Sequence, residues 1–522
     1  MTAAESRTGG RRRGGREARH ALRAAPLADD VRPVRPGLEG GWYRPLSEAG
    51  VQRIHQAVLQ ALGEVGLGDA IPSCVEVCCA AGAEFGPDGR LRFPASLVED
   101  MIAVAARDFT LFAQDPGHDI ELTAKRVYYG TAGAPTQVLD LATRSYRDAT
   151  VKDLYDAARL ADRLDNIHFF QRPLTPTDIA DLEELDINTA YACVAGTAKH
   201  SAASFTSGAR TAKVLEMLHH VAGGEAAWRA RPIVSNSNCH VVPPMKFGED
   251  ASQVLEVCVR GGMPVLLLSA GQAGATAPPA LAGAVVQAVA EVLAGLIYVN
   301  AIQPGAPAIF GTWPFVSDLR TGSMSGGSGE QALLAPACAQ MAHFYRLPGA
   351  AAAGMADAKL PDVQAGYEKG IANVMAGLSG LNLIYEAAGT QASLLGFCPE
   401  ALLIDNDMIG QCLRCVRGIE VTEDSVSLEV MREVCLTGPG HYLGHDQTLE
   451  LMEREYVYPA LGDRTSPKEW AAAGQPDILA RAGAEKDRIL ASHHPNHLPA
   501  AADDAIRAAF PIRLSRAEVG RT

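Results

Sequence analysis

The sequence predicts an α/β protein in which eight parallel strands alternate with eight helices and close into a barrel. The first observation is a continuous apolar run at residues 263–268, which is typical of a strand buried on both faces. The second is a long apolar helix that starts at Pro278-Pro279, ends near Val299 and leads to another apolar run at residues 308–310. Together they form a right-handed strand–helix–strand crossover. The third is that this unit recurs along the chain.

The recurring unit begins with a short apolar or small-residue run, and successive runs start 31 to 44 residues apart. Helices with recognisable starts lie between the runs, at Thr150 with Asp153 and at Ser328. Eight such units can close into a TIM barrel, which leaves no sheet edge exposed. A doubly wound open sheet is the alternative, but residues 130–133 do not form its Gly-rich dinucleotide loop. The runs begin near Val127, Ile167, His200, Ile233, Pro264, Ala308, Ala350 and Asn382.

The long apolar helix is hydrophobic enough to suggest a membrane span. Gln287 and Glu291 lie in its middle, however, and polar side chains are costly in lipid. We therefore expect a buried core helix.

The segments outside the barrel differ from it in composition. Residues 1–40 are rich in Gly, Arg, Ala and Pro and predict a disordered basic tail, with a nucleic-acid-binding or targeting arm as the alternative. Residues 41–120 predict an N-terminal helical region, and residues 121–436 the barrel. Residues 437–515 predict a C-terminal helical extension, with helices near 446–456 and 477–490, packed on the barrel or on a second subunit of a homo-oligomer.

Composition limits the function. Of the 522 residues, 48% are hydrophobic and 20% charged, as in an ordinary globular protein. The net charge of −14 argues against nucleic-acid binding, which needs clustered Lys and Arg. The eleven cysteines show no disulfide framework, and no apolar segment follows the basic N-terminus. We therefore expect a cytoplasmic protein that binds neither nucleic acid nor membrane.

A TIM barrel carries its active site at the carboxyl ends of its strands. The residues at those positions are polar, aromatic and partly acidic, which suits a small cationic or zwitterionic ligand. A quaternary ammonium ion has no N–H to donate and needs aromatic faces. The aromatic residues could instead pack in the core, and Glu386 could pair with a barrel Arg or Lys. The positions are Thr131, Gln171, Arg172, Phe205, Asn236, Asn238, His240, Gln272, Thr312, Trp313, Asp357, Lys359, Tyr385 and Glu386.

Two further motifs have competing interpretations. Cys412-x-x-Cys415 resembles a redox pair, but it follows a helical pattern and favours buried thiols. His441 and His445, beside Asp446, could ligate a metal, but their loop context favours ordinary hydrogen bonding. We expect no metal site.

Several long motifs resemble the trimethylamine methyltransferase family. They are residues 274–311, 322–330, 358–369 (AKLPDVQAGYEK), 383–389 (LIYEAAG) and 138–165, and the tail GHYLGHDQTLELMEREYVYP. The resemblance extends over about residues 45–490. It implies a TIM barrel that passes a methyl group from a methylated amine to the cobalt of a separate corrinoid protein, so that no cofactor binds tightly to this chain.

The family has two branches. One carries pyrrolysine and uses trimethylamine; the other lacks it and takes quaternary amines such as glycine betaine or related betaines. The pyrrolysine loop aligns with residues 354–361, where this chain has ordinary residues, among them Lys359. This difference favours the quaternary-amine branch.

The predicted function is therefore methyl transfer from a quaternary amine to the Co(I) of a corrinoid protein. The alternatives are a trimethylamine methyltransferase, a metal-dependent barrel hydrolase or lyase using His441, His445 and Asp446, and a betaine-binding protein without activity. The predicted catalytic residues are Lys359 and Glu386, and the predicted substrate-binding residues are His240, Gln272, Trp313, Tyr385, Asn238 and Phe205.

Overall fold

The computed structural model describes residues 32–521, so the predicted basic tail lies mostly outside the described residues. The chain divides into two compact units. The larger unit consists of residues 36–419 and 459–522, and the smaller one includes residues 420–458.

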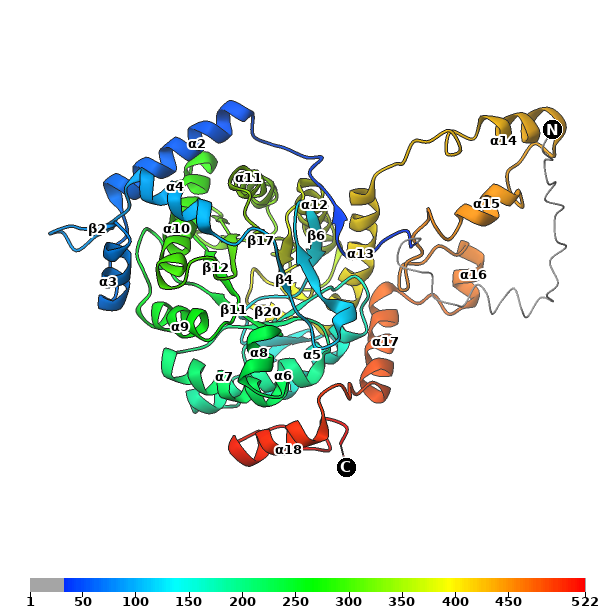
Figure 1. Cartoon of the computed structure of the whole chain (residues 1–522). Coiled ribbons are helices and arrows are strands. Elements are labelled where there is room, and N and C mark those ends of the chain that lie inside the picture. The colour runs from blue at the N-terminus through cyan, green and yellow to red at the C-terminus, as the bar shows by residue number, and fades with distance from the viewer. Residues whose placement is uncertain (1–31, 522) are drawn as a thin grey trace, which may run out of the picture. The chain divides into compact units, whose positions relative to one another are not determined.

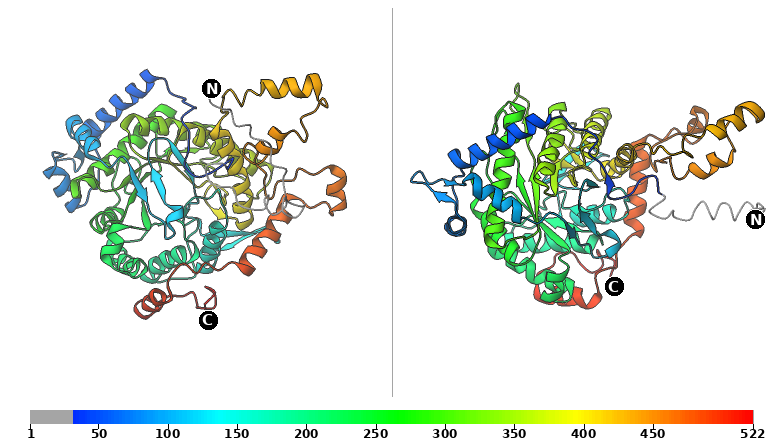
Figure 2. Two further views of the ribbon diagram at one scale, coloured as in Figure 1. Left: turned by 45° about the vertical axis from the view of Figure 1, so that its right-hand side comes forward. Right: turned by 45° about the horizontal axis from the view of Figure 1, so that its top comes forward.

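A curled sheet forms the centre of the larger unit, as Figures 1 and 2 show. Its strand order is β1-β6-β18-β17-β14-β12-β11-β10-β9, and all neighbours are parallel except β1 and β6. Strand β6, next to the terminal strand β1, is also linked to β9 at the opposite end of the row, because Gly130 after β6 forms a parallel bridge with Phe169 before β9. The His168 N–H also donates to the Tyr129 carbonyl at 2.7 Å. The strands are β1 (Leu38–Glu39), β6 (Arg126–Tyr129), β9 (Phe170–Gln171), β10 (Ser201–Ala203), β11 (Val234–Asn238), β12 (Val265–Ser269), β14 (Ala308–Thr312), β17 (Gly349–Ala352) and β18 (Leu383–Tyr385).

Each of the eight predicted runs overlaps one of the parallel strands, so the predicted α/β class and parallel sheet are confirmed. Helices alternate with the strands and surround them, as the left view of Figure 2 shows. They are α5 (Val151–Asp162), α6 (Leu182–Gly196), α7 (Gly208–Ala222), α8 (Glu225–Ala230), α9 (Glu249–Arg260), α10 (Leu281–Ile302), α11 (Gly329–Tyr345), α12 (Val363–Ser379) and α13 (Pro399–Arg417).

Helix α10 is the long apolar helix of the sequence. Among the described residues it alone is long and apolar enough to cross a membrane, and 83% of its most apolar window is buried in the fold. Its buried carboxylate, Glu291, accepts hydrogen bonds from the Ser269 hydroxyl, the Met245 N–H and the Gln287 amide. The prediction of a buried core helix is confirmed, because the helix is buried and Glu291 in its middle forms hydrogen bonds with neighbouring residues of the fold.

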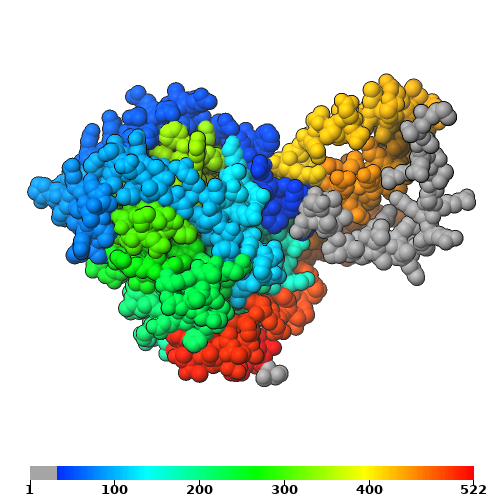
Figure 3. All heavy atoms as spheres, viewed as in Figure 1, coloured from blue at the N-terminus to red at the C-terminus, as the bar shows by residue number. Residues whose placement is uncertain are grey.

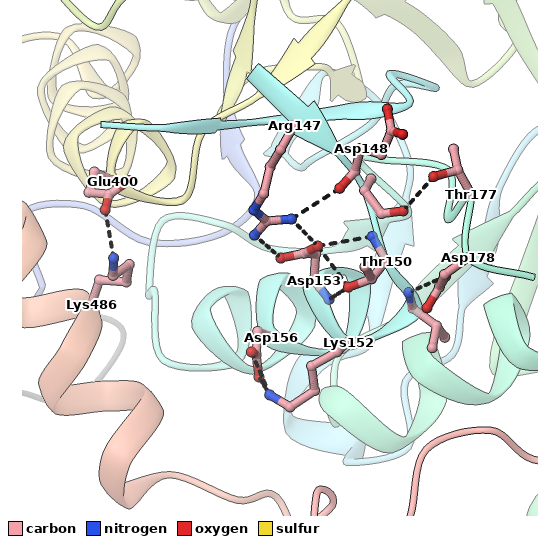
Figure 4. Close-up of polar contacts among 12 residues, drawn as sticks. Arg147, Asp148, Thr150, Lys152, Asp153, Asp156, Thr177, Asp178, Glu400 and Lys486 are labelled. Carbon is pink, nitrogen blue, oxygen red and sulfur yellow. Dashed lines mark hydrogen bonds and ion pairs between the residues drawn. The ribbon is translucent and has the colours of Figure 1, made fainter. Parts of the chain in front are cut away.

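Helix α5 begins at a capping box, shown in Figure 4. The Thr150 hydroxyl accepts from the Asp153 N–H at 3.2 Å, and the Asp153 carboxylate accepts from the Thr150 N–H at 2.9 Å. Arg147, on β8 (Ser145–Asp148), donates two hydrogen bonds of 2.7 Å to Asp153. The cap therefore fixes the start of α5 and ties it to β8.

Replacing Thr150 with alanine is expected to lower the free energy of unfolding by about 1 kcal/mol, because the N–H groups of the first turn lose their acceptor. Urea unfolding at constant m measures this change. Thr150→Ser retains the hydroxyl and is the matched control. An equal loss in both variants would contradict the role of the cap.

Short strand pairs lie in the loops and were not predicted. Strands β13 and β15 continue the parallel pairing beyond the ends of β12 and β14, and β7, β8, β19 and β20 form a small sheet of four. Their bounds are β13 (Gln272–Ala273), β15 (Phe315–Ser317), β16 (Met324–Ser325), β7 (Gln137–Asp140), β19 (Thr390–Gln391) and β20 (Gly396–Phe397).

The N-terminal part of the larger unit contains the predicted helices and two short hairpins. Ser47 caps the first helix by accepting from the Gly50 N–H. The elements are α2 (Glu48–Gln60), α3 (Pro72–Ala80), β2 (Glu84–Phe85), β3 (Leu91–Arg92), α4 (Ala95–Val104), β4 (Phe109–Leu111) and β5 (Ile120–Leu122).

Three C-terminal helices, α16 (Pro467–Ala472), α17 (Ile478–Ser492) and α18 (Ala500–Ala509), complete the larger unit. Lys486 of α17 pairs with Glu400 of α13 at 2.7 Å (Figure 4). Asp503 of α18 accepts from the Tyr191 hydroxyl of α6 at 2.6 Å, and Figure 3 shows this red segment against the green helices. Helices α17 and α18 thus pack on the outside of the helix layer.

The smaller unit contains α14 (Leu428–Arg432) and α15 (Asp446–Leu451). The predicted helix over 446–456 is wrong in its length, because α15 ends at Leu451 and the chain turns. Glu453 and Glu455 follow that end, where negative charge opposes the helix dipole.

Candidate active site

A cavity of about 400 Å³ lies at the carboxyl ends of the parallel strands. Every parallel strand except β17 contributes to its wall, either directly or through the residues that follow it. This is the end at which parallel α/β folds bind their ligands. The lining residues are Ala132, Gly133, Ala134, Gln171, Arg172, Ser204, Phe205, Ser237, Asn238, Cys239, Asp250, Ala251, Val254, Leu268, Ala270, Trp313, Phe315, Glu386 and Leu394.

Aromatic side chains form one part of the wall. Trp313 follows β14, and Phe205 and Phe315 line the cavity with it. Tyr385 does not line the cavity but packs against Trp313, with ring centroids 5.3 Å apart. Phe169 supports Tyr385 in turn, at 4.8 Å. The indole is therefore held in place from behind and presents a fixed aromatic surface.

Glu386 is the buried acid of the cavity, with 1% of its surface exposed. Burial raises the pKa of this carboxyl to about 8. Its Oε2 atom has no hydrogen-bond partner among residues 32–521. Its φ of 55° is the left-handed conformation, which is strained for a glutamate and often marks functional sites.

A buried ion pair fixes the turn after Glu386. Lys369 of α12 pairs with Asp405 of α13 at 2.5 Å. The same Asp405 oxygen accepts from the Gly389 N–H at 2.8 Å. Two helices thus hold the segment that carries the glutamate.

Three other polar atoms in the wall lack a protein partner within the described part of the chain. They are Gln171 Oε1, Asn238 Oδ1 and Trp313 Nε1. The Asn238 amide nitrogen, in contrast, donates to the Ala251 carbonyl and so fixes the side chain. Because buried polar groups are normally hydrogen-bonded, this clustering in one cavity indicates a ligand site.

Six of the predicted strand-end positions line this cavity: Gln171, Arg172, Phe205, Asn238, Trp313 and Glu386. The last four were also predicted as catalytic or substrate-binding residues. Tyr385 lies one layer behind them. His240, Gln272 and Lys359 do not line the cavity.

The residues outside the cavity have other contacts. The buried His240 donates from Nε2 to the Glu291 carbonyl at 2.9 Å, and burial lowers its pKa to about 4. Gln272, on β13, accepts from the Ser317 hydroxyl of the adjacent strand β15. Lys359 is exposed, and its ammonium donates to the Asp357 carbonyl at 2.6 Å.

Several lining residues were absent from the predicted site. Cys239 directly follows β11, so its position at a strand end was a usable signal. Asp250 and Ala251 come from the first turn of α9, and Leu394 from the β19–β20 loop. Nothing in the sequence signals that these loop and helix residues turn inward.

The two further motifs of the sequence lie away from the cavity. His445 accepts from the Gln447 N–H and caps α15. In the described residues, no three His, Cys, Asp or Glu side chains are placed to hold a metal ion. Cys412 and Cys415 are free thiols on α13, the first buried and the second exposed.

Comparison with known sequences identifies the family. The sequence profile described as trimethylamine methyltransferase (MTTB) matches residues 12–518. The chain belongs to this family. The resemblance deduced from the sequence motifs is therefore confirmed, and the chain is a methyltransferase.

Relatives within the trimethylamine methyltransferase family carry two different substrate names. Trimethylamine methyltransferase MttB of Desulfitobacterium hafniense is 31% identical, over 88% of this chain and 92% of its own length. Glycine betaine methyltransferase of the same species is 30% identical, over 89% of this chain and 95% of its own length. Trimethylamine methyltransferase MttB of Methanosarcina barkeri is 30% identical, over 85% of this chain and 90% of its own length.

Residues 354–361, which the sequence analysis aligned with the pyrrolysine loop, lie between β17 and α12. Here the Asp357 carboxylate accepts from the Ser325 and Ser393 hydroxyls and from the Gly326 N–H. Glu368 of α12 accepts from the Asp357 N–H at 2.8 Å. These hydrogen bonds connect the loop to neighbouring segments. None of residues 354–361 lines the cavity.

Proposed function

We propose that this chain transfers a methyl group from a quaternary amine, glycine betaine or a related betaine, to the Co(I) of a separate corrinoid protein. The observation that carries the proposal is Glu386, a buried carboxyl with an unpaired oxygen in a cavity walled by Trp313, Phe205 and Phe315. An N-methylated cation is attracted both to aromatic faces and to a carboxylate. Within the described part of the chain, burial and not a neighbouring cation determines the pKa of Glu386, so its carboxylate is available to a ligand.

The residues of the chain bind and orient the amine. Breaking the N–CH3 bond leaves the electron pair on nitrogen, so the departing amine is neutral and needs no proton donor. The partner's corrinoid supplies the nucleophile that accepts the methyl group. The aromatic wall and Glu386 keep the nitrogen in one position and exclude water, which favours attack at a fixed methyl group.

We also propose that the curled sheet is a closed (β/α)8 barrel formed within residues 121–436. The bridge between Gly130 and Phe169 and the bond from His168 to Tyr129 support this closure. A cytoplasmic location and a homo-oligomeric state remain part of the proposal.

Trimethylamine is the second candidate substrate, and one observation favours it. A free tertiary amine would leave as an anion unless it receives a proton. The raised pKa of about 8 keeps Glu386 protonated at neutral pH, which suits a proton donor. The two candidates predict opposite pH dependence, because cation binding needs the carboxylate and proton donation needs the acid.

A panel of methylated amines tests the proposal. The protein is incubated with Co(I) cobalamin and glycine betaine, choline, tetramethylammonium or trimethylamine, and cobalamin methylation is followed by absorbance. We expect methylation with glycine betaine and none with trimethylamine. Methylation by trimethylamine alone would contradict the proposal, as would methylation by no amine when a corrinoid partner is supplied.

A further inference from the structure

Arg172 is a second charged residue in the cavity wall. It follows β9, and its N–H donates to the Ala202 carbonyl at 2.9 Å, so its backbone is part of the strand pairing. Its guanidinium donates to the Thr175 hydroxyl and forms no ion pair with any described residue. Burial lowers the pKa of this guanidinium. The cavity wall thus contains a positively charged residue that has no ion-pair partner among residues 32–521.

The acidic residues near Arg172 do not neutralise it. Asp186 acts on it through space, but its carboxylate accepts from the N–H and the hydroxyl of Thr206 at 2.8 and 2.9 Å. Glu386 lines the same cavity, but the shift in its pKa comes from burial and not from Arg172. Cys239 is subject to both charges, since Arg172 lowers and Glu386 raises the pKa of its thiol. The cavity wall therefore contains a guanidinium, at Arg172, and a carboxyl, at Glu386, that becomes negative as the pH rises through its pKa of about 8 or when a cation binds beside it.

Buried charges are strongly disfavoured unless they are paired. A single cation could satisfy Glu386 but would leave Arg172 unpaired. A ligand with a positive group at one end and a negative group at the other satisfies both.

We propose that Arg172 binds the anionic group of a zwitterionic substrate whose quaternary nitrogen lies at Glu386 and Trp313. This inference rests on the proposed function and adds the residue that distinguishes betaines from other quaternary amines. A carboxylate is the group that fits best, because a guanidinium can donate two parallel hydrogen bonds to its oxygens. The unpaired Trp313 Nε1 is a further donor in the same wall.

The test compares glycine betaine, which has a carboxylate, with tetramethylammonium, which lacks one. Replacing Arg172 with glutamine is expected to raise the Kd and KM for glycine betaine about 10- to 100-fold, the range for a hydrogen bond to a charged group. The Kd for tetramethylammonium is expected to stay within about twofold of the wild-type value, and kcat for glycine betaine to change little. Titration calorimetry gives Kd, and the cobalamin assay gives KM and kcat.

Two further variants make the result specific. Arg172→Lys retains the positive charge but cannot donate two parallel hydrogen bonds. It is expected to bind glycine betaine more tightly than Arg172→Gln and less tightly than the wild type. Arg210→Gln removes a nearby guanidinium that bonds to Thr206 outside the cavity, and is expected to leave both Kd values unchanged.

The outcomes separate the two proposals. If Arg172→Gln weakens both ligands equally, or if the wild type binds them equally well, Arg172 does not bind the anionic group. If the wild type binds glycine betaine through Arg172 but no quaternary amine methylates cobalamin, the proposed methyl transfer fails and the zwitterion site remains.

Discussion

Replacing Glu386 with glutamine is expected to weaken the binding of glycine betaine by about two orders of magnitude at pH 9. A carboxylate about 5 Å from a quaternary nitrogen contributes roughly 3 kcal/mol at an effective dielectric constant of about 20. The positive charge on nitrogen decreases as the N–CH3 bond breaks, so Glu386 stabilises the bound substrate at least as much as the transition state. The loss is therefore expected in Kd and KM, with kcat not reduced.

Glu400→Gln is the matched control for this variant. Glu400 is also a buried carboxylate, but it pairs with Lys486 outside the cavity. We expect this change to affect stability without changing the Kd of glycine betaine. An undiminished affinity in Glu386→Gln would show that the carboxylate does not bind the cation.

The same substitution is expected to stabilise the ligand-free protein at pH 8. The pKa of Glu386 is raised from 4.5 to about 8 in the folded state, so the carboxyl favours folding below pH 4.5 and this contribution is lost as the pH rises to about 8. Glutamine carries no charge and avoids that loss. Thermal unfolding of both proteins at pH 5 and pH 8 should show a difference that grows with pH.

The affinity for a quaternary amine is expected to rise about tenfold per pH unit up to about pH 8 and to level off above it. Only the ionised form of Glu386 attracts the cation, and its pKa in the empty cavity is about 8. Titration calorimetry with tetramethylammonium between pH 6 and pH 9 measures this slope. Proton release on binding should accompany it below pH 8.

The dependence of affinity on pH can be assigned to Glu386 by excluding the other charged and titratable groups of the cavity. Burial raises the pKa of the Cys239 thiol to about 11, so it stays neutral over this range, and Arg172 stays charged. Asp250 also lines the cavity, and Asp250→Asn is expected to keep the slope. The profile should become flat in Glu386→Gln; a slope that persists in that variant would assign the titration to another group.

The parallel strands could be predicted from the sequence because each is a short run that must be buried on both faces. The runs at residues 263–268 and 308–310 became β12 and β14, and the helix between them became α10. Gln287 and Glu291 indicated correctly that α10 packs against protein. The short pairs β13–β15 and β19–β20 lack this signal, because two residues cannot establish a periodicity.

The site was predictable only in part, because a strand end defines a place but not the direction of the loop that follows. Trp313 and Glu386 come immediately after their strands and line the cavity. Lys359 lies farther along, in the loop that Asp357 holds to Ser325 and Ser393, away from the cavity. Those bonds join segments far apart in the chain, and no local pattern reveals them.

The unpaired guanidinium and carboxyl of the cavity also have a practical consequence for finding the natural substrate. Without ligand, Arg172 and Glu386 make the interior less favourable than it is with a complementary molecule in place. Ligand binding should therefore raise the melting temperature. A compound present at a hundred times its Kd adds about 2.7 kcal/mol to the free energy of unfolding. A melting-temperature screen of small dipolar metabolites, run without cobalt or partner protein, should rank its true substrate first.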